Sequence, residues 1–394
     1  MIPYGKQWIN DDDVAAVVHA LRSDYVTTGP TVEEFEKQLA MYVGARHAIA
    51  VNSATSALHL AMRVAGIGAG DRVVTSSNTF LASANCAAFV GATPDFSDID
   101  PVAHNLDAQI LEEHWQSDTK AVVAVAYAGQ SCDMPAIAVV ARSRGAIVIE
   151  DACHGVGGGF LREGQVWKLG GHPWADMTVF SFHPVKAMTT GEGGVLITGD
   201  DGWAAEARRL RSHGVERKDF RGLGAPDDSD FAEQGSWYYE MHNLGYNYRL
   251  TEIQCALGLS QLRRLDAFVR RRREIVAQYN EAFADLPWLQ IPALRNPVDR
   301  DLIAWHLYTV QIDFKAIGKP RAQIMTNLRA KGIGTQVLYI PVHLQPWYRQ
   351  TYGYRLGKCP NAENYYRRAL SLPLYPGLTD EDVDRVIDEV RSLC

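Results

Sequence analysis

The sequence predicts an α/β protein with a large, mostly parallel sheet, followed by a smaller α+β unit. Three observations support this fold class. From about residue 47, short apolar strands alternate with helix-like segments, which is the pattern of a mostly parallel sheet. After about residue 250, long helices and then isolated strands follow. The chain of 394 residues is also long enough for one large core and a second, smaller one.

The large sheet is predicted from short apolar runs that are separated by helix-like segments. Continuous apolar runs of this kind are typical of strands that are buried on both faces. We expect strands at residues 48–51, 72–75, 121–126, 146–149, 176–182 and 194–198, and helices at residues 56–62, 80–89 and 135–142.

The second part of the chain begins with long helices. Residues 251–283 are predicted to form one or two of them, because apolar residues recur there at helical spacing. A proline-containing segment, 287–297, then leads to an α+β unit with strands at 307–312 and 335–339.

We therefore expect two units. Residues 1–250 form the large domain, with an N-terminal arm over residues 1–30, and residues 251–394 form the long connecting helices and the small C-terminal domain. The stretch 220–234 is rich in Gly, Asp and Pro, which predicts a mobile surface loop.

Composition and charge exclude several classes of function. The chain is 47% hydrophobic and 22% charged, as in ordinary globular proteins, and its net charge of −7 argues against nucleic-acid or anionic-membrane binding. No signal-type apolar core opens the chain, and no run approaches the roughly 18 apolar residues of a membrane span. Six cysteines without C-x-x-C spacing indicate reduced thiols and no zinc site. These features predict a cytoplasmic protein.

Unusual residues follow three of the predicted strands, and ligands collect at the carboxyl ends of strands in an open α/β sheet. Asn52-Ser-Ala-Thr-Ser56 leads from a strand into a helix, and such a start offers N–H groups and hydroxyls to a phosphate. Glu150-Asp-Ala-Cys-His154 places carboxylates at a strand end, where they need cationic or donor partners. Lys186 follows a third strand within Ser181–Gly194, a stretch rich in hydroxyls and glycines.

Each feature alone has an ordinary explanation: a helix cap, a structural hydrogen bond, or a solvated loop lysine. Together, and in this order, they match the needs of pyridoxal 5'-phosphate, which are a phosphate cradle, an acid and a desolvated lysine. The lysine would bond to the cofactor and later move a proton between carbons. The acid would keep the pyridine nitrogen protonated, so that the ring accepts electrons. The sequence therefore predicts a pyridoxal phosphate enzyme.

The chain also resembles the sugar-nucleotide aminotransferases of the DegT/DnrJ/EryC1/StrS family over nearly its whole length. The resemblance implies fold-type I of the pyridoxal phosphate enzymes (aspartate aminotransferase-like), with a seven-stranded sheet in the large domain. The matching motifs are Thr28–Pro30, Asn52–Ser56, Asn78–Phe80, Glu150–His154, Ser181–Lys186, Gly245–Leu250 and Tyr339–His343.

The resemblance assigns four residues to the reactive part of the cofactor. Lys186 would be the catalytic Schiff-base lysine, and Asp151 would pair with the pyridine nitrogen. His154 would lie near the phenolic oxygen, and Phe80 would stack on the ring.

Four more residues would hold the cofactor's phosphate. Ala54, Thr55 and Ser181 would do so within one subunit. Asn247 would reach the phosphate of a partner subunit's cofactor. The resemblance thus implies a homodimer with shared active sites.

Within the family, the chain most resembles the 4-aminotransferases of pseudaminic acid biosynthesis. Matching segments are Ser53–Ala57, Arg211–Gly214, Gly258–Leu262, Pro341–Gln345 and Leu370–Leu374. This branch implies amino transfer from L-glutamate to C4 of UDP-2-acetamido-2,6-dideoxy-β-L-arabino-hexos-4-ulose. The implied substrate-binding residues are Tyr4, Asp24, Tyr25, Val26, Thr27, Leu338, Tyr339, Ile340, Pro341 and His343.

Other motifs have simpler interpretations. Gly155–Gly159 follows a strand, but the next residues have turn character, so we reject a dinucleotide-binding turn. The histidines are not spaced as metal ligands, and we expect no metal site. The run Arg270–Arg273 is interpreted as a solvated helix face, or as a cover for a subunit contact.

Several alternatives to this function stay open. A cofactor-free relative that binds a sugar nucleotide is disfavoured by the presence of both Lys186 and Asp151. Lys186 also disfavours a sugar dehydratase, because those relatives have a histidine in its place. Aminotransferases that act at C3, or on a D-xylo 4-ketosugar of the bacillosamine or perosamine type, fit the sequence as well.

Overall fold

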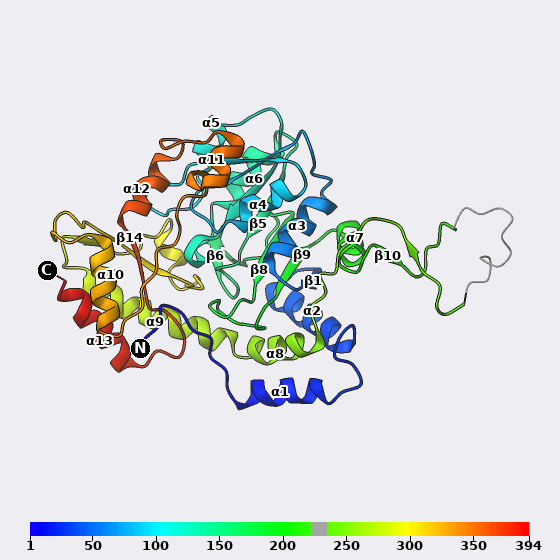
Figure 1. The fold of residues 1–394 in the computed structure, drawn as a ribbon, viewed down its shortest axis with the longest axis horizontal. Coiled ribbons are helices and arrows are strands. Elements are labelled where there is room, and N and C mark those ends of the chain that lie inside the picture. Colours follow the sequence, from blue (N-terminus) through cyan, green and yellow to red (C-terminus); the bar gives the residue numbers. More distant parts are fainter. Residues whose placement is uncertain (223–234, 394) are drawn as a thin grey trace.

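A computed structural model describes residues 1–222 and 235–393, and Figure 1 shows how they are arranged. A seven-stranded sheet with helices on both faces forms the centre, and a three-stranded sheet lies to one side with α10, α13 and both chain ends. Most of the loop predicted at 220–234 lies outside the described residues.

The large sheet has the strand order β1-β9-β8-β5-β4-β2-β3. Four of its strand pairs are parallel, whereas β9 runs antiparallel to both β1 and β8. The predicted fold class, with its mostly parallel sheet of seven strands, is confirmed. The strands are β1 (His47–Val51), β2 (Arg72–Ser76), β3 (Thr93–Ser97), β4 (Thr119–Val125), β5 (Ile147–Asp151), β8 (Met177–Ser181) and β9 (Gly194–Thr198).

Helices cover both faces of this sheet because successive side chains of a strand point to opposite faces. On β5, Ile149 is buried with α3, α4 and α7, whereas Val148 is buried with α5 and α6 on the other face. Burial on both sides explains the uninterrupted apolar runs in the sequence. The helices of this unit are α2 (Pro30–Val43), α3 (Ala54–Val64), α4 (Ala82–Phe89), α5 (Ala108–Glu113), α6 (Met134–Arg142) and α7 (Asp201–Arg211).

Two parts of the large unit were not predicted. Strand β3 contains Pro94 and Asp95 and lies at the edge of the sheet, where a proline is tolerated and only one neighbour is needed. Strands β6 (Gly159–Arg162) and β7 (Gln165–Lys168) form an antiparallel hairpin. This hairpin follows the glycine run Gly155–Gly159 in place of a helix, as expected when the dinucleotide-binding turn was rejected.

The second part of the chain begins with the predicted helices, α8 (Glu252–Leu262) and α9 (Leu265–Phe283). The small sheet is antiparallel, and its core includes side chains of α9, α10 and α13. The remaining elements of this part are β12 (Leu289–Gln290), β13 (Tyr308–Ile312), β14 (Ala369–Leu372), α10 (Arg321–Ala330), α11 (Pro346–Tyr352), α12 (Pro360–Arg368) and α13 (Asp380–Arg391), with short 3-10 turns at Tyr127–Gly129, Pro297–Asp299 and Val342–Leu344.

The prediction of a strand at 335–339 is wrong. This segment forms only an isolated bridge, between Gln336 and Ser371 of β14. It then leaves the small sheet for the large one, where the Leu338 carbonyl accepts a hydrogen bond from the Tyr127 hydroxyl at 2.6 Å.

The N-terminal segment lies along the small sheet before it reaches α1 (Asp11–Leu21). The Ile2 N–H donates to the Gly332 carbonyl at 2.7 Å, and the Leu374 N–H donates to the Tyr4 carbonyl at 3.0 Å. Tyr4 is thereby fixed beside the junction of the two sheets. The division of the chain near residue 250 stays a prediction.

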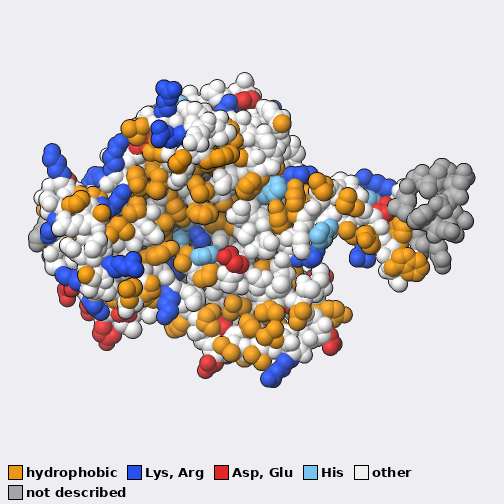
Figure 2. Space-filling model, viewed as in Figure 1, with side chains coloured by type: hydrophobic (Ala, Val, Ile, Leu, Met, Phe, Trp, Pro, Cys, Tyr) orange, Lys and Arg blue, Asp and Glu red, His pale blue; other side chains and the backbone are white. Residues whose placement is uncertain are grey.

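A two-stranded arm projects from the body beside α7 (Figure 1). It consists of β10 (Val215–Glu216), β11 (Glu240–Met241) and the described residues that adjoin them. Figure 2 shows hydrophobic side chains along this arm and over the lobe that contains α1. The exposed apolar side chains are Trp237, Tyr239, Met241 and Leu244 on the arm and Val14, Val18 and Leu21 on α1. Within residues 1–222 and 235–393, none of the helices is both long and apolar enough to span a bilayer.

The interpretation of Arg270–Arg273 as a solvated face or subunit contact is wrong for Arg272. Arg270 is exposed, but the Arg272 side chain is completely buried. The reason is its position on α9, because it lies on the same helix face as the buried residues Phe268, Ile275 and Val276.

Candidate active site

A cavity of about 390 Å³ lies at the carboxyl ends of β4, β5 and β8, beside the start of α3. This is the edge where the sequence predicted the site. The lining residues are Tyr4, Ser53, Ala54, Thr55, Leu58, Thr79, Phe80, Ala82, Val125, Asp151, Cys153, His154, Ser181, His183, Val185, Lys186, Glu192, Gly193, Leu338 and Tyr339.

Lys186 lies in the turn between β8 and β9, and hydrogen bonds fix the shape of this turn. Phe182 donates its N–H to the Gly193 carbonyl at 2.9 Å, and its own carbonyl accepts from the Thr190 N–H at 3.0 Å. The Thr189 hydroxyl donates to the same Phe182 carbonyl at 2.8 Å. The hydroxyl residues around the lysine therefore close the turn and leave the lysine side chain to line the cavity.

The surroundings of Lys186 favour its neutral form. Burial is the largest cause that lowers the pKa of its amine, and the positive charge of Arg272 lowers it further. The Asp151 carboxylate acts in the opposite direction. A neutral amine is the form that attacks a carbonyl and accepts a proton.

The start of α3 forms the opposite wall. Ser53 caps this helix, because its Oγ accepts a hydrogen bond from the Ser56 N–H at 3.1 Å. Ala54 and Thr55 follow in the first turn, where N–H groups lack partners within the helix and attract anions. A Cβ at Gly194 of β9 would lie 2.4 Å from the Ala54 nitrogen. Glycine at 194 is therefore what lets β9 approach the helix start so closely.

Asp151 ends β5 and is buried, with both carboxylate oxygens held. The Ser83 hydroxyl donates to Oδ2 at 2.6 Å, and the Cys153 N–H donates to Oδ1 at 3.2 Å. These bonds fix the carboxylate, and each oxygen keeps capacity for a further donor. Glu150 points to the other face of the sheet, where its carboxylate contacts His172 and Thr178.

His154 presents a fixed tautomer to Tyr339. Its Nδ1 accepts from the Ala128 N–H at 3.2 Å, and burial lowers its pKa well below the usual range. The neutral ring therefore carries its proton on Nε2 and donates it to the Tyr339 hydroxyl at 3.2 Å. The hydroxyl proton of Tyr339 is then free for a molecule in the cavity.

The cavity brings together all seven residues predicted to bind the cofactor within one subunit. Phe80 is 54% exposed, and its ring faces that of Tyr339 with centroids 6.0 Å apart. Of the residues predicted for cofactor and substrate, those that line the cavity are Ala54, Thr55, Phe80, Asp151, His154, Ser181, Lys186, Tyr4, Leu338 and Tyr339.

Other predicted residues do not line this cavity. Asp24, Tyr25, Val26 and Thr27 are exposed beyond the end of α1, and Asn247 is exposed at the root of the arm.

Three residues of the 340–343 segment that were predicted to bind the substrate also do not line the cavity. They lie in two different environments. Ile340 is exposed, and Pro341 is buried. His343 is completely buried and shares hydrogen bonds with Ser77 Oγ at 2.6 Å and with Glu363 Oε1 at 2.9 Å. The structure thus makes His343 a link between two elements and not a wall of the cavity.

Some residues of the site were missed in the sequence. Ser83, which fixes Asp151, is hidden in an alanine-rich helix with no distinctive motif. Cys153 lies inside the quoted Glu150–His154 motif, but nothing in its spacing indicated that it lines the cavity. Arg272 had a signal, because its position on the buried stripe of α9 could be read from the spacing of apolar residues.

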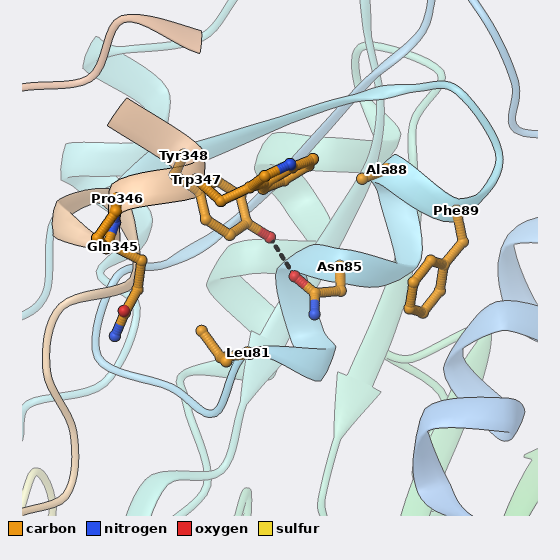
Figure 3. Close-up of a pocket in the computed structure, with 8 residues that line it drawn as sticks. All are labelled: Leu81, Asn85, Ala88, Phe89, Gln345, Pro346, Trp347 and Tyr348. Carbon is orange, nitrogen blue, oxygen red and sulfur yellow. Dashed lines mark hydrogen bonds between the residues drawn. The ribbon is translucent and has the colours of Figure 1, made fainter. Parts of the chain in front are cut away.

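A second cavity of about 560 Å³ begins at Leu81, the residue after Phe80 (Figure 3). It lies between α4 and α11, where the Tyr348 hydroxyl donates to Asn85 Oδ1 at 2.6 Å. No ionisable group other than a tyrosine hydroxyl lines it, so it offers little chemistry of its own. The lining residues are Leu81, Asn85, Ala88, Phe89, Gln345, Pro346, Trp347 and Tyr348.

Comparison with known proteins identifies the family. Residues 7–391 match the DegT/DnrJ/EryC1/StrS aminotransferase family. The chain belongs to this family. It is similar to the spore coat polysaccharide biosynthesis protein SpsC of Bacillus subtilis, with 43% identity over all of this chain and 97% of SpsC.

Solved structures of the family have the same fold. PseC of Helicobacter pylori, an aminotransferase of pseudaminic acid biosynthesis, is 29% identical, with a TM-score of 0.88 over 100% of this chain and 98% of PseC. Spr1654 of Streptococcus pneumoniae in its PLP form is 28% identical, with a TM-score of 0.87 over 100% of this chain and 98% of that chain. The fold-type I assignment is therefore confirmed, and this chain is a sugar aminotransferase that depends on pyridoxal phosphate.

The residues of the cavity fit this cofactor. The helix start at Ala54 and the glycine at 194 form a close cradle of N–H groups for a phosphate. The fixed carboxylate of Asp151 suits a protonated pyridine nitrogen, and Lys186 is the lysine among the lining residues. Bound pyridoxal phosphate supplies an electron sink for the carbon that loses a proton.

Replacing Asp151 by asparagine should lower kcat more than cofactor affinity. The change keeps the size of the side chain but removes the anion, so the pyridine nitrogen loses its proton and the electron sink weakens. We expect kcat to fall by on the order of 10²-fold or more, measured by steady-state kinetics after cofactor content is checked by absorbance. Asp95→Asn is the control, because Asp95 pairs with Arg72 and Lys358 outside the cavity. A near-native kcat in Asp151→Asn would mean that Asp151 is structural.

Proposed function

We propose that this aminotransferase moves the amino group of L-glutamate to C4 of a UDP-linked 4-keto-6-deoxy-N-acetylhexosamine. The substrate would be UDP-2-acetamido-2,6-dideoxy-β-L-arabino-hexos-4-ulose, an intermediate of pseudaminic acid biosynthesis. The likeness to PseC over the full length of both chains supports this choice. The observation that carries it is the cavity itself, because Tyr4, Leu338 and Tyr339 line it together with Lys186.

The residues of the site would have distinct roles in the reaction. Lys186 would hold the cofactor and, once released, its neutral amine would take a proton from one carbon and return it at another. Asp151 would keep a proton on the pyridine nitrogen, and Ser83 would hold Asp151 in place. Tyr339, oriented by His154, would donate its hydroxyl proton to an oxygen of the cofactor or sugar.

The nucleotide would supply binding energy far from the reacting carbon. A sugar held through its remote diphosphate and base reaches the lysine in a fixed orientation, which lowers the entropic part of the barrier. Tyr4 and Leu338 line the cavity together with Lys186 and are proposed to contact the sugar nucleotide.

We propose further that the enzyme is a homodimer with shared sites. Asn247 and residues 24–27 are exposed and lie outside the cavity of their own chain. In a two-fold dimer, such residues can complete the partner's site. The exposed apolar side chains on α1, on the arm and at Phe89 and Trp347 of the second cavity are the kind of surface that a second copy covers.

A second candidate substrate is favoured by the 43% identity to SpsC, which is named for spore coat polysaccharide biosynthesis. In that case the ketosugar would serve a surface polysaccharide and could be a D-xylo 4-ketosugar or a 3-ketosugar. The location of Lys186 and Asp151 in one cavity supports catalysis over the non-catalytic role that the sequence had left open.

Mixing two inactive variants should test the shared site. Lys186→Ala and Asn247→Ala homodimers should each be nearly inactive, whereas a hybrid dimer has one site with both residues intact. After statistical exchange of equal amounts, about a quarter of all sites are intact, and activity should recover toward that fraction. If verified exchange restores no activity, Asn247 acts in its own subunit or in no site.

The substrate is tested by supplying glutamate with each UDP-4-keto epimer separately and following amino-sugar formation by mass spectrometry. We expect the L-arabino epimer to react at least about tenfold faster, because the pocket must orient C4 and the neighbouring C5 substituent together. Faster reaction of the D-xylo epimer would favour a bacillosamine-type role. Absence of product from both would contradict a UDP-4-ketosugar substrate.

A further inference from the structure

Arg272 is a buried cation whose guanidinium contacts the backbone carbonyl of Lys186. It lies on α9 and is completely buried. Its Nη2 donates to the Lys186 carbonyl at 3.3 Å, and its Nη1 donates to the Leu374 carbonyl at 2.8 Å and to the His306 carbonyl at 3.3 Å. One guanidinium thus joins the turn of the large sheet to two segments of the small unit.

The charge of Arg272 is not neutralised by an acid. Across residues 1–222 and 235–393, no Asp or Glu forms an ion pair with it, and its Nε has no hydrogen-bond partner. A buried charge held only by carbonyls is costly. A methionine or leucine would suit the apolar stripe, but it would leave the four carbonyls that accept from Arg272 without this donor, so the arginine is retained for its hydrogen bonds.

Through Leu374, the contacts of Arg272 extend to Tyr4, which also lines the cavity. The Leu374 carbonyl accepts from Arg272, and the Leu374 N–H donates to the Tyr4 carbonyl at 3.0 Å. The residue after Tyr4 also lies against the lysine turn, since a Cβ at Gly5 would be 3.5 Å from Cβ of Val185. Lys186 and Tyr4 are therefore anchored through the same guanidinium and Leu374.

The charge of Arg272 also acts on ionisable groups of the cavity. It lowers the pKa of Lys186 and of His306, in both cases after burial, which is the larger cause. The other ionisable groups that act on the Lys186 amine are Asp151 and Cys153, and two neutral imidazoles, His154 and His306, lie beside it.

We propose that Arg272 is a positioning residue of the transamination, which holds Lys186 and Tyr4 in register and places a cation against the lysine turn. The inference rests on the proposed role of Lys186. Without the guanidinium, the lysine turn loses this hydrogen-bonded link to the Leu374 segment, and a positive charge that acts on the Lys186 amine is removed.

The test compares Arg272→Met, which removes the charge and the donors, with Arg272→Gln, which removes the charge but keeps an amide donor. Arg273→Met is the matched control, because Arg273 is the next residue of α9 and donates to the Ile303 carbonyl at 2.8 Å without contacting Lys186. In the full-length protein freed of cofactor, Lys186 is labelled with acetic anhydride over a pH series and its peptide is quantified by mass spectrometry. kcat is measured on the reloaded proteins.

Both Arg272 variants should shift the labelling midpoint of Lys186 upward by about one pH unit, because loss of a nearby positive charge makes the ammonium form easier to keep. They should also lower kcat by about tenfold or more, with Arg272→Met the more affected. Arg273→Met should leave the midpoint of Lys186 in place.

A folded Arg272→Met with an unchanged midpoint and kcat would overturn the proposal, and so would an equal shift in Arg273→Met. If Arg272→Met does not fold, Arg272→Gln decides by the same two measurements. Activity that survives in Lys186→Ala would instead refute the proposed role of Lys186, and the labelling shift would then stand only as an electrostatic contact.

Discussion

The backbone pairing of strand β9 with its two neighbours, β1 and β8, sets the geometry of the active site. Gly194 at the start of β9 is paired with Val51 at the end of β1 and with Ser181 at the end of β8. This pairing places Gly194, the start of α3 and the lysine turn side by side. A shift by one residue in either pair would turn the side chains of the strand to the opposite face. Because Val195 and Ile197 pack in one core cluster and Leu196 packs in another, such a shift would disrupt the packing on both faces of β9.

The polar groups brought to this edge are tolerated because each has a partner or loses its charge. Asp151 is held by Ser83 and by the Cys153 N–H, so its burial is compensated. Burial holds the pKa of His154 well below its usual range, and its Nδ1 accepts a backbone N–H. Within residues 1–222 and 235–393, no hydrogen bond holds the Lys186 amine, and burial lowers its pKa. The site thus combines one fixed carboxylate with one amine whose pKa is lowered by burial.

Much of the fold and of the candidate site could be predicted from the sequence. Strands buried on both faces are short and apolar, so the polar residues that end them, such as Asp151 and Lys186, stand out. Edge strand β3 was not predicted because Pro94 and Asp95 interrupt its apolar pattern. The segment at 335–339 has strand-like composition, but it leaves its sheet to line the cavity. Contacts between distant segments, such as Ser83 with Asp151, have no local pattern to reveal them. Asn247 and residues 24–27 do not line their own cavity, so one chain alone leaves their roles as predictions.

The role of Lys186 as the residue that holds the cofactor is tested most directly by chemical reduction of the native, cofactor-loaded protein. Borohydride fixes pyridoxal phosphate to the lysine that carries it, and peptide mapping by mass spectrometry then locates the added mass. The added mass should be found on the peptide that contains Lys186, and it should disappear in Lys186→Arg but persist in Lys168→Arg, since Lys168 lies on β7 and contacts Tyr42 outside the cavity. Labelling of any other lysine in the native protein would contradict the assignment on which the site has been built.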